Sequence, residues 1–154
     1  LGYPIELRMI GSASPKMYSR LQKKIKGMDP CRKFLKFLGP IMHENISSEN
    51  FSSDLFLFGS SCETISITVM EGMASGLPIV CSNKGPMSEL LGDSCLYFDP
   101  HNVDSVIRAI RMMLDNPNLR LSKSKSSYGK SLNYSWSRCA KDTFGFISNV
   151  KNEL

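Results

Sequence analysis

Residues 61–78 read SCETISITVMEGMASGLP and are the most informative part of the sequence. Glu63 stands just before an expected helix start, and Glu71 lies eight positions later, inside that helix. Thr64 or Ser66 can cap the helix, because a hydroxyl oxygen at its start accepts a free backbone N–H. A Gly-Leu-Pro stop and a short apolar run follow, so the stretch predicts a helix that leads into a strand.

The two glutamates are spaced to reach two separate groups. At roughly 1.5 Å of rise per residue, a carboxylate at the lip of a helix and another two turns in can reach groups about 10–12 Å apart. Between them lies the positive end of the helix, where free N–H groups can hold a diphosphate. That geometry suits a nucleotide sugar, which has hydroxyls at both ends and charge in the middle. The alternative is that Glu63 and Glu71 are two solvated carboxylates flanking a surface helix.

Apolar strand-like runs alternate with helical patterns along the chain, as is typical of a parallel sheet with crossover helices. We expect strands at residues 5–10, 34–38, 55–58, 78–82 and 96–98, and helices at 15–25, 44–50, 66–75 and 87–91. Methionines at helical spacing are expected to fill the core. The apolar face of the helix at 66–75 is expected to consist of Ile67, Met70, Met73 and Ala74. The sequence therefore predicts an α/β fold with a Rossmann-like doubly wound parallel sheet.

The chain turns helical from residue 102 onward, with expected helices at 104–114, 119–132 and 136–150. The Ser/Lys-rich middle of the second of these, residues 122–127, predicts a solvated surface helix. The last helix has an apolar side made of Trp136, Cys139, Ala140, Phe144 and Ile147. No internal repeat or boundary is visible, so residues 1–154 are expected to form a single domain with a helical C-terminal tail.

The composition fits one globular domain of 154 residues with 42% hydrophobic residues. No run approaches the ~20 apolar residues of a membrane span, and no signal-peptide pattern is present. The five cysteines form no Cys-x-x-Cys pair, which favours reduced thiols in a cytosolic setting, with Cys81 and Cys95 buried on strands. His43 and His101 have no partner at metal-ligand spacing, so they are expected to be exposed and to bind no metal.

Several segments of the chain, taken in order, resemble one protein family. The pattern of Glu63, seven residues, Glu71, Gly-Leu-Pro and a strand resembles the signature of retaining glycosyltransferase family 4, the group 1 glycosyl transferases. Further matching segments lie on both sides of the motif, at residues 7–11, 37–41, 54–57, 60–61, 83–91 and 134–136. The resemblance extends over residues 5–150, in the order and spacing of the family.

The resemblance implies a fold and an activity. Family members have the GT-B architecture, in which two Rossmann-like domains enclose an active site, and this chain is similar to the C-terminal, donor-binding domain. The family resemblance implies transfer of a hexose from a UDP- or GDP-sugar to a glycan or lipid-linked acceptor. It implies no cofactor and no metal, because helix N-terminal amides and basic residues would stabilise the leaving diphosphate.

The resemblance also implies roles for individual residues. Glu63 would contact the hydroxyls of the donor sugar near the developing oxocarbenium charge, and Glu71 would accept hydrogen bonds from the ribose hydroxyls. The sugar and the diphosphate would lie beside the backbone N–H groups of Thr64, Ile65 and Ser66. The nucleobase would be edged by the backbone around Pro40 and Ile41.

The chain departs from the family pattern in three ways. The family usually has an aromatic residue and a glycine where this chain has Ile65 and Ser66, so a Cβ is added where close backbone approach is wanted. Gly72 replaces a common alanine, and a glycine inside a helix costs ~1 kcal/mol relative to alanine. The family's first C-domain strand, its Gly-Arg loop with a following Lys, and the acceptor domain have no counterpart before Leu1. The chain therefore resembles a fragment of a two-domain enzyme and is expected to be inactive by itself.

Two other functions stay open. Ile65 and Ser66 are compatible with a non-catalytic Rossmann-like module that binds nucleotide sugars or a partner without turnover. An epimerase with the related two-domain fold would rely on a different set of carboxylates and histidines. For Glu89 the alternatives are a structural role and contact with the donor, and for His43 they are exposure and contact with the donor.

A basic cluster precedes the motif and consists of Arg20, Lys23, Lys24, Lys26, Arg32, Lys33 and Lys36. The cluster is compatible with a solvated helix face, with steering of an anionic donor, and with contact to anionic lipid. Interleaved aromatic residues are missing from its helix, which argues against nucleic acid as a partner. The expected location is cytoplasmic, with a peripheral position at the inner face of a membrane left open.

Overall fold

The computed structural model describes residues 3–152, with side-chain burial for residues 3–150. By the contacts among its residues, the chain divides into two compact units, Leu1–Ile46 and Ser47–Leu154. The expectation that residues 1–154 act as one donor-binding domain stays a prediction.

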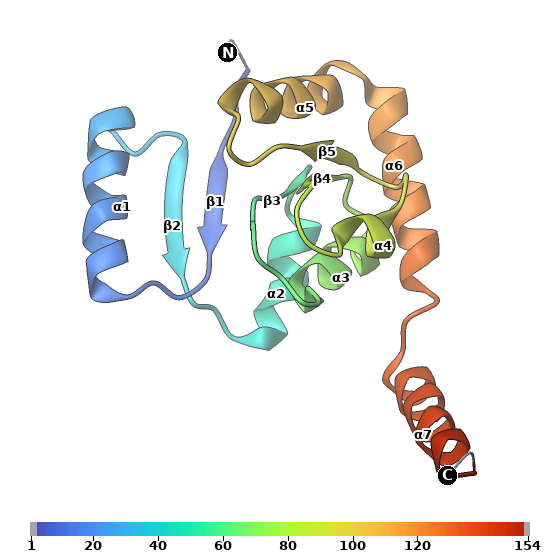
Figure 1. The fold of residues 1–154 in the computed structure, drawn as a ribbon. Helices are drawn as coiled ribbons and strands as arrows, with labels where there is room; N and C mark the ends of the chain where they lie inside the picture. Colours follow the sequence, from blue (N-terminus) through green and yellow to red (C-terminus); the bar gives the residue numbers. More distant parts are fainter. Residues whose placement is uncertain (1–2, 153–154) are drawn as a thin grey trace. The chain divides into compact units, whose positions relative to one another are not determined.

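The first unit is a parallel βαβ unit (Figure 1). Its elements are β1 (Leu7–Ile10), α1 (Pro15–Met28) and β2 (Leu35–Gly39). The helix begins where the sequence predicts, because the Ser14 hydroxyl accepts the backbone N–H of Met17 at 3.3 Å. Tyr18 of α1 packs on Phe37 of β2 with ring centroids 5.7 Å apart, and this contact holds the helix on the sheet.

A buried carboxylate closes the turn between α1 and β2. Asp29 is 3% exposed and accepts the backbone N–H groups of Lys33, Phe34 and Leu35 at 2.8–2.9 Å. Burial by itself raises the pKa of Asp29, but the three N–H donors and the charge of Lys33 outweigh it, so the pKa is lowered. The carboxylate is therefore committed to the backbone of the turn.

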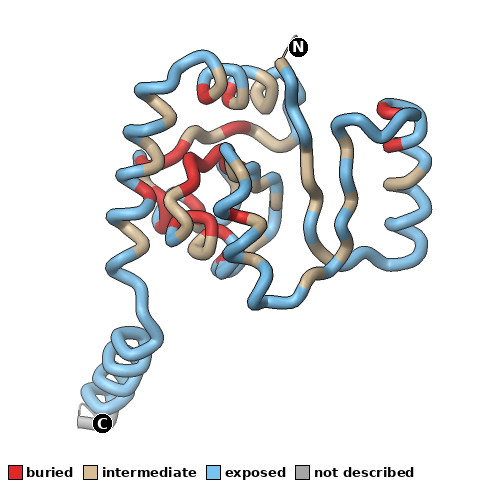
Figure 2. Tube along the Cα trace, turned by 180° about the vertical axis from the view of Figure 1, so that it is seen from behind, coloured by how far each residue is buried: buried red, intermediate tan, exposed pale blue. Residues whose placement is uncertain are grey.

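The second unit contains a three-stranded parallel sheet in the order β3-β4-β5. Helix α2 (His43–Phe51) spans the boundary between the units. The elements that follow are β3 (Phe56–Phe58), α3 (Ile67–Ala74), β4 (Ile79–Ser82), α4 (Met87–Leu91), β5 (Leu96–Phe98), α5 (Val103–Asp115), α6 (Pro117–Ser131) and α7 (Trp136–Asn152). All residues of the central strand β4 are buried, and Figure 2 shows buried positions gathered around it.

Alternate side chains of β4 contribute to two cores. Ile79 and Cys81 pack with residues of α3 and α4, whereas Val80 packs with Ala109 and Met113 of α5. Successive residues of a strand point to opposite faces, so this sheet carries helices on both faces. The doubly wound prediction is confirmed.

The strand orders also fit a Rossmann-like fold. The described sheets are β1-β2 and β3-β4-β5, and every pairing in them is parallel. Parallel strands joined by crossover helices, as in each of these sheets, are typical of doubly wound folds.

The buried face of α3 agrees with the predicted one at Met70 and Met73 and differs at Ile67 and Ala74. Val69, Gly72 and Met73 are buried, whereas Ile67 is 53% exposed. A Cβ added to Gly72 would lie 3.1 Å from the ring of Phe56 on β3. The glycine therefore lets an aromatic ring lie directly against the helix backbone, which gives this helix-interior glycine a packing role.

The methionines divide into two groups. Those that fill the core, as predicted, include Met73, Met87 and Met113. The prediction is wrong for others, because the exposed large hydrophobic residues include Met17, Met28, Met42 and Met112. Helical spacing alone does not say whether the second face of a helix has something to pack against.

Helix α6 is docked through hydroxyl groups, so the prediction of a solvated surface helix at residues 122–127 holds for Ser122, Lys125 and Ser126 and is wrong for the docked side. Ser127 is fully buried, and its hydroxyl donates to the carbonyl of Leu77 at 3.1 Å. The Ser124 hydroxyl donates to the carbonyl of Gly76 at 2.5 Å. Both carbonyls belong to the turn that directly follows α3, so α6 is held against the end of that helix.

Two lysines of α6 continue the same pattern. Lys130 Nζ donates to the carbonyl of Leu91 at 2.7 Å, and Lys123 Nζ donates to the carbonyl of Asp93. These acceptors lie at and just after the end of α4. Cations near a helix C-terminus interact favourably with its dipole, so α6 completes the ends of two helices at once.

The apolar side of helix α7 is exposed. Every described side chain from residue 136 to residue 150 is exposed. Trp136 is 81% exposed and Phe144 is 71% exposed. The helix and its apolar side follow the prediction, and the described residues supply no partner for that side.

Candidate functional site

Two loops meet at the carboxyl ends of β3 and β4, the edge at which doubly wound sheets bind ligands. The loop after β3, residues 59–66, carries Glu63, and the loop after β4, residues 83–86, contains Gly85. Gly85 has a φ of 67°, and a Cβ on it would lie 3.3 Å from the carbonyl oxygen of Glu63. Only glycine allows this conformation together with this close approach, so the second loop supports the backbone of the first.

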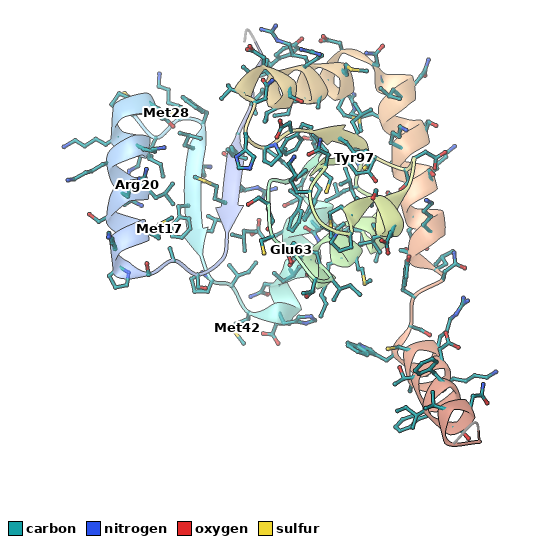
Figure 3. The ribbon with its side chains drawn as sticks, viewed as in Figure 1. Met17, Arg20, Met28, Met42, Glu63 and Tyr97 are labelled. Atoms are coloured by element: carbon teal, nitrogen blue, oxygen red, sulfur yellow. The ribbon has the colours of Figure 1, made fainter. Side chains whose placement is uncertain are left out.

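Glu63 is half-buried in its loop, where Figure 3 labels it. The Ser60 hydroxyl donates to the carbonyl of Cys62 at 3.3 Å and braces the residues just before the glutamate. The backbone that presents Glu63 is therefore held from two directions, by its own serine and by Gly85.

Ser66 caps helix α3. The residue is 4% exposed, and its hydroxyl accepts the backbone N–H of Val69 at 3.4 Å. Of the two predicted caps, Thr64 and Ser66, the structure selects Ser66. Its φ of −110° is open to any residue, so a serine in this position does not strain the helix start.

A run of backbone N–H groups surrounds this cap. Within the described part of the chain, no hydrogen bond to another residue is donated by the backbone N–H of Thr64, Ile65, Ser66, Ile67 or Thr68. Together with the helix dipole, such donors form a site for an anion at a helix N-terminus. The structure thus brings the predicted backbone donors together directly after Glu63.

Glu71 lies inside α3 and is half-buried. Its carbonyl accepts both the backbone N–H and the hydroxyl of Ser75, at 3.0 Å and 2.8 Å, which closes the end of the helix. Glu63 and Glu71 therefore belong to one unit, on a supported loop and on the helix that follows it. Their roles toward a donor stay predictions.

Lys84 in the second loop is a residue that the sequence reasoning missed. Its Nζ lies 3.9 Å from Oδ1 of Asp99, which follows β5, and both side chains are 42% exposed. The signal was available, because Lys84 is a lone basic residue next to a glycine in a loop after a strand. The loop that contacts Glu63 therefore carries a half-exposed cation. An anionic ligand could bind Lys84 while the lysine stays near Asp99.

Pro40 and Ile41, the residues predicted to edge a nucleobase, lie in the other unit. They follow Gly39, the last residue of β2, and they lead into α2. Pro40 is exposed and Ile41 is half-buried. Both stand at the carboxyl end of a parallel strand, as the prediction requires, and their contact with a base stays a prediction.

The remaining candidates are at the surface. Glu89 is exposed in the first turn of α4, where a carboxylate stabilises the helix dipole. His43 begins α2 and His101 follows β5, and both are exposed as predicted. Within residues 3–152, no group of three or more His, Cys, Asp or Glu side chains is placed to hold a metal ion.

The cysteines fall into two classes. Cys31, Cys62 and Cys139 are exposed, whereas Cys81 and Cys95 are buried as predicted, with Cys95 just before β5. Burial, with a smaller effect of Cys95, raises the pKa of Cys81 to about 12, and burial raises that of Cys95 to about 11. Neither buried thiol can act as a nucleophile near neutral pH.

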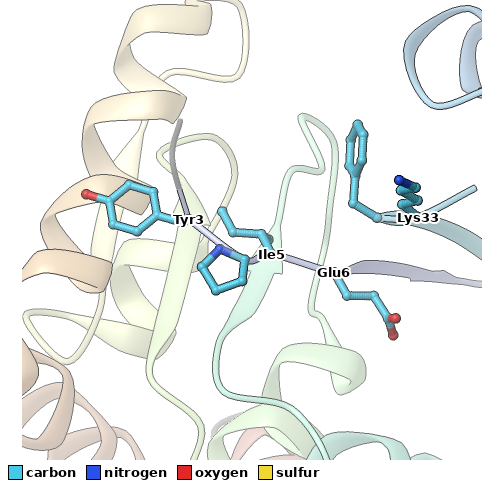
Figure 4. A pocket seen from close by; sticks show the side chains of 6 residues that line it. Tyr3, Ile5, Glu6 and Lys33 are labelled. Atoms are coloured by element: carbon cyan, nitrogen blue, oxygen red, sulfur yellow. The ribbon is translucent and has the colours of Figure 1, made fainter.

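A shallow hollow of ≈ 560 Å³ lies in the first unit, at the amino ends of β1 and β2 (Figure 4). Its lining residues are Tyr3, Pro4, Ile5, Glu6, Lys33 and Phe34. None of the predicted site residues lines it. It is also at the wrong edge, because parallel α/β sheets bind ligands at the carboxyl ends of their strands.

The sequence pattern of the family described as "Glycosyl transferases group 1" matches residues 1–130 of this chain. The chain belongs to this family. Among curated relatives, the O-antigen chain mannosyltransferase B of Escherichia coli is 26% identical over 110 residues, which cover 71% of this chain and 29% of the relative. This group 1 glycosyltransferase chain thus spans about a third or less of the length of the curated relatives that it matches.

Solved structures confirm the fold of the group 1 chain. Sucrose-phosphate synthase of Thermosynechococcus elongatus superimposes with a TM-score of 0.84 at 17% identity, over 97% of this chain and 39% of that one. HepE of Anabaena, solved in complex with UDP, superimposes with a TM-score of 0.83 at 16% identity, over 94% of this chain and 41% of that one. The structural neighbours are GT-B glycosyltransferases, and the resemblance to the C-terminal GT-B domain is confirmed. No helix among the described residues is long and apolar enough to cross a membrane.

Proposed function

We propose that this chain is the donor-binding domain of a retaining glycosyltransferase that moves a hexose from a nucleoside diphosphate sugar to a glycan or lipid-linked acceptor. The observation that carries the proposal is the placement of Glu63 directly before a run of free backbone N–H groups at the start of α3. The UDP complex of the Anabaena neighbour supports a nucleotide donor.

The proposed chemistry divides between the loop and the helix. The bond between the sugar C1 and the diphosphate oxygen breaks with its electron pair on the oxygen, and the N–H groups after Glu63 stabilise that charge. The acceptor hydroxyl oxygen bonds to C1 on the same face, and its proton passes to the leaving phosphate oxygen. Glu63 lies near the positive charge that develops on the sugar ring, and no metal or cofactor takes part.

Glu71 holds the other end of the donor in this proposal. A carboxylate that accepts hydrogen bonds from two ribose hydroxyls keeps the nucleoside fixed while the sugar reacts. Pro40 and Ile41 border the nucleobase, and Lys84 adds a positive charge near the diphosphate.

Calorimetric titration of the chain with UDP-glucose and GDP-mannose tests donor binding. Glu71→Ala is expected to weaken binding roughly 10–100-fold, because two hydrogen bonds to a charged acceptor are lost. Asp104→Ala removes an exposed carboxylate from the first turn of α5 and serves as the matched control, with unchanged affinity expected. Equal affinity of the Glu71→Ala variant and the original chain contradicts the ribose contact.

A pair of glycine variants tests the support of the Glu63 loop. Gly85→Ala is expected to weaken donor binding several-fold, because the new Cβ strains the backbone and presses on the Glu63 carbonyl. Gly59 lies in the loop that carries Glu63, and a Cβ added to it meets no atom within 4 Å. The Gly59→Ala variant should therefore bind the donor with the affinity of the original chain. Equal effects of the two variants would show that the loop contact does not position the site.

Turnover separates the proposal from a non-catalytic binding module. The chain by itself is expected to bind donor without transferring or hydrolysing it, and the longer protein that includes an acceptor domain is expected to transfer sugar. Transfer by the 154-residue chain overturns the expectation of an inactive fragment. Donor binding without transfer by the longer protein favours the binding module.

A further inference from the structure

Positive charge is concentrated in the first unit. Residues 1–46 contain nine Lys and Arg residues against three Asp and Glu residues, a net charge of +6, whereas the whole chain carries +5. The second unit is therefore slightly acidic. The net positive charge of the chain therefore lies in the unit that contains β1, α1 and β2.

Helix α1 carries much of this charge on one side. At about 100° per residue, Lys16, Arg20, Lys23 and Lys24 fall within an arc of about 100° on the helix. All four side chains are exposed. The opposite side of the helix holds Ile25, which is buried, and Tyr18, which is 48% exposed and packs on Phe37 of β2. The basic stripe, defined by those four cations, therefore faces away from the sheet.

No acidic side chain offsets the basic stripe. Helix α1 contains neither Asp nor Glu, and no ion pair joins the stripe to another described residue. Glu6 is paired with Arg8 and with Lys36, and the Asp29 carboxylate is committed to three backbone N–H groups. The stripe therefore keeps its full charge at the surface.

Two exposed methionines border the basic stripe. Met17 is 56% exposed and Met28 is 68% exposed, and by helical position both fall next to Lys24. Figure 3 shows Met17, Arg20 and Met28 spread along the length of α1. A basic helix face binds anionic lipid headgroups by charge, and apolar side chains beside it add contact with the membrane interface.

We propose that the exposed side of α1 docks on an anionic lipid surface, with the basic stripe on the headgroups and Met17 and Met28 entering the interface. A convex helix face offers no cradle for a single nucleotide, and the stripe from Lys16 to Lys24 spreads its charge over about 12 Å along the helix. Nucleic acid is less suited, because stacking of successive bases needs several exposed aromatic rings and α1 carries a single one, Tyr18, which contacts Phe37.

Vesicle sedimentation of the full chain tests this surface. The probes are vesicles of phosphatidylcholine alone and of phosphatidylcholine with phosphatidylglycerol at about 7:3. Binding is expected only to the anionic vesicles and should weaken as salt is added. Arg20→Glu/Lys24→Glu is expected to reduce the bound fraction roughly tenfold or more. Met17→Ser/Met28→Ser should reduce it a few-fold and leave the salt dependence in place.

Two control variants separate the basic stripe from net charge and from α7. Arg111→Glu/Lys125→Glu makes the same change in net charge at exposed positions of α5 and α6, and its binding should change less than twofold. Trp136→Ser/Phe144→Ser removes the exposed apolar side of α7 and should leave binding intact. Circular dichroism of each variant checks that it is folded.

Four results would overturn the proposal. The first two are equal binding of the chain to neutral and anionic vesicles, and a loss of vesicle binding in Arg111→Glu/Lys125→Glu as large as that in Arg20→Glu/Lys24→Glu. The other two are a loss of vesicle binding only in Trp136→Ser/Phe144→Ser, and tighter binding to duplex DNA than to anionic vesicles at the same salt concentration. The test is independent of sugar transfer, so the proposed function stands or falls separately.

Discussion

Helices α6 and α7 follow each other in the chain and behave in opposite ways. Helix α6 is polar, with a Ser/Lys-rich middle, and yet it buries Ser127 completely and is bound through four side chains to the ends of α3 and α4. Helix α7 has a continuous apolar side, and yet its described side chains are all exposed.

The difference shows that a helix docks only where a complementary surface is present. Helix α6 lies beside carbonyls at and just after two helix ends, and a short hydroxyl or a lysine reaches each of them. Helix α7 finds no apolar surface among the described residues. Hydrophobic pattern measures what a helix can bury and says nothing about whether the partner is present.

Thiol labelling gives the largest effect, because Cys139 lies on α7 and Cys81 lies in the core below α3 and α4. Burial raises the pKa of Cys81 to about 12, so near pH 8 its thiolate fraction is roughly a thousandfold below that of an ordinary thiol. Cys139 is expected to react with a thiol reagent at least that much faster, as resolved by mass spectrometry of the labelled peptides. Slow labelling of Cys139 would show that the apolar side of α7 is covered.

The same thiol predicts a pH effect on stability. A pKa raised above the ordinary value means that the unfolded chain loses its proton first, so the contribution of Cys81 is complete below about pH 9 and is lost as the pH rises toward 12. The midpoint of thermal unfolding should therefore fall across this range, and Cys81→Ala should reduce the slope of that fall.

Ser127→Leu tests the hydroxyl docking of α6. The larger side chain does not fit a fully buried position, and the Leu77 carbonyl loses its donor, so a loss of about 2–4 kcal/mol in the free energy of unfolding is expected. Urea unfolding measures it. Ser126→Leu, at an exposed position of the same helix, should change stability by less than about 0.5 kcal/mol. Similar values for the two variants would remove the distinction between α6 and α7.

Lys130→Met tests the docking of α6 at the end of α4. The Nζ donor to Leu91 is lost while most of the aliphatic stem is kept, so the expected loss is about 1–2 kcal/mol in the same urea experiment. Lys125→Met, at an exposed position of α6, is the control and should be neutral. A neutral Lys130→Met variant would leave Ser124, Ser127 and Lys123 as the basis of docking.

Trp136→Ser/Phe144→Ser gives the smallest effect. Both side chains are exposed, so the stability of the 154-residue chain should change by less than about 0.5 kcal/mol, measured by the same urea unfolding. A loss comparable to that of Ser127→Leu would break the comparison, because it would place the apolar side of α7 in a packed interface.

Much of the fold could be predicted from local signals in the sequence. The bounds of α4 and β5 agree with prediction to the residue, and α1 begins at its Ser-Pro start and runs three residues past its expected end. Caps, prolines and short β-branched runs act over a few residues, so they are readable without the rest of the structure. The docking of α6 could not be predicted from the sequence, because its acceptors are carbonyls 30 to 50 residues away in the chain.

The candidate site divides in the same way. The positions of Glu63 and Glu71 around a helix start follow from spacing and capping, and the choice of Ser66 over Thr64 as the cap required coordinates. The contact of Gly85 with the Glu63 carbonyl was out of reach of the sequence, since it joins two loops through a backbone conformation.

The contact between Gly85 and Glu63 also has an evolutionary consequence. The loop that presents Glu63 takes its shape from residues 83–86, which belong to a different crossover of the sheet. Under the proposed function, a lineage can retune which sugar the site accepts by changing this neighbouring loop while both glutamates stay in place. Variation in sugar preference should then be sought first at the positions beside Gly85.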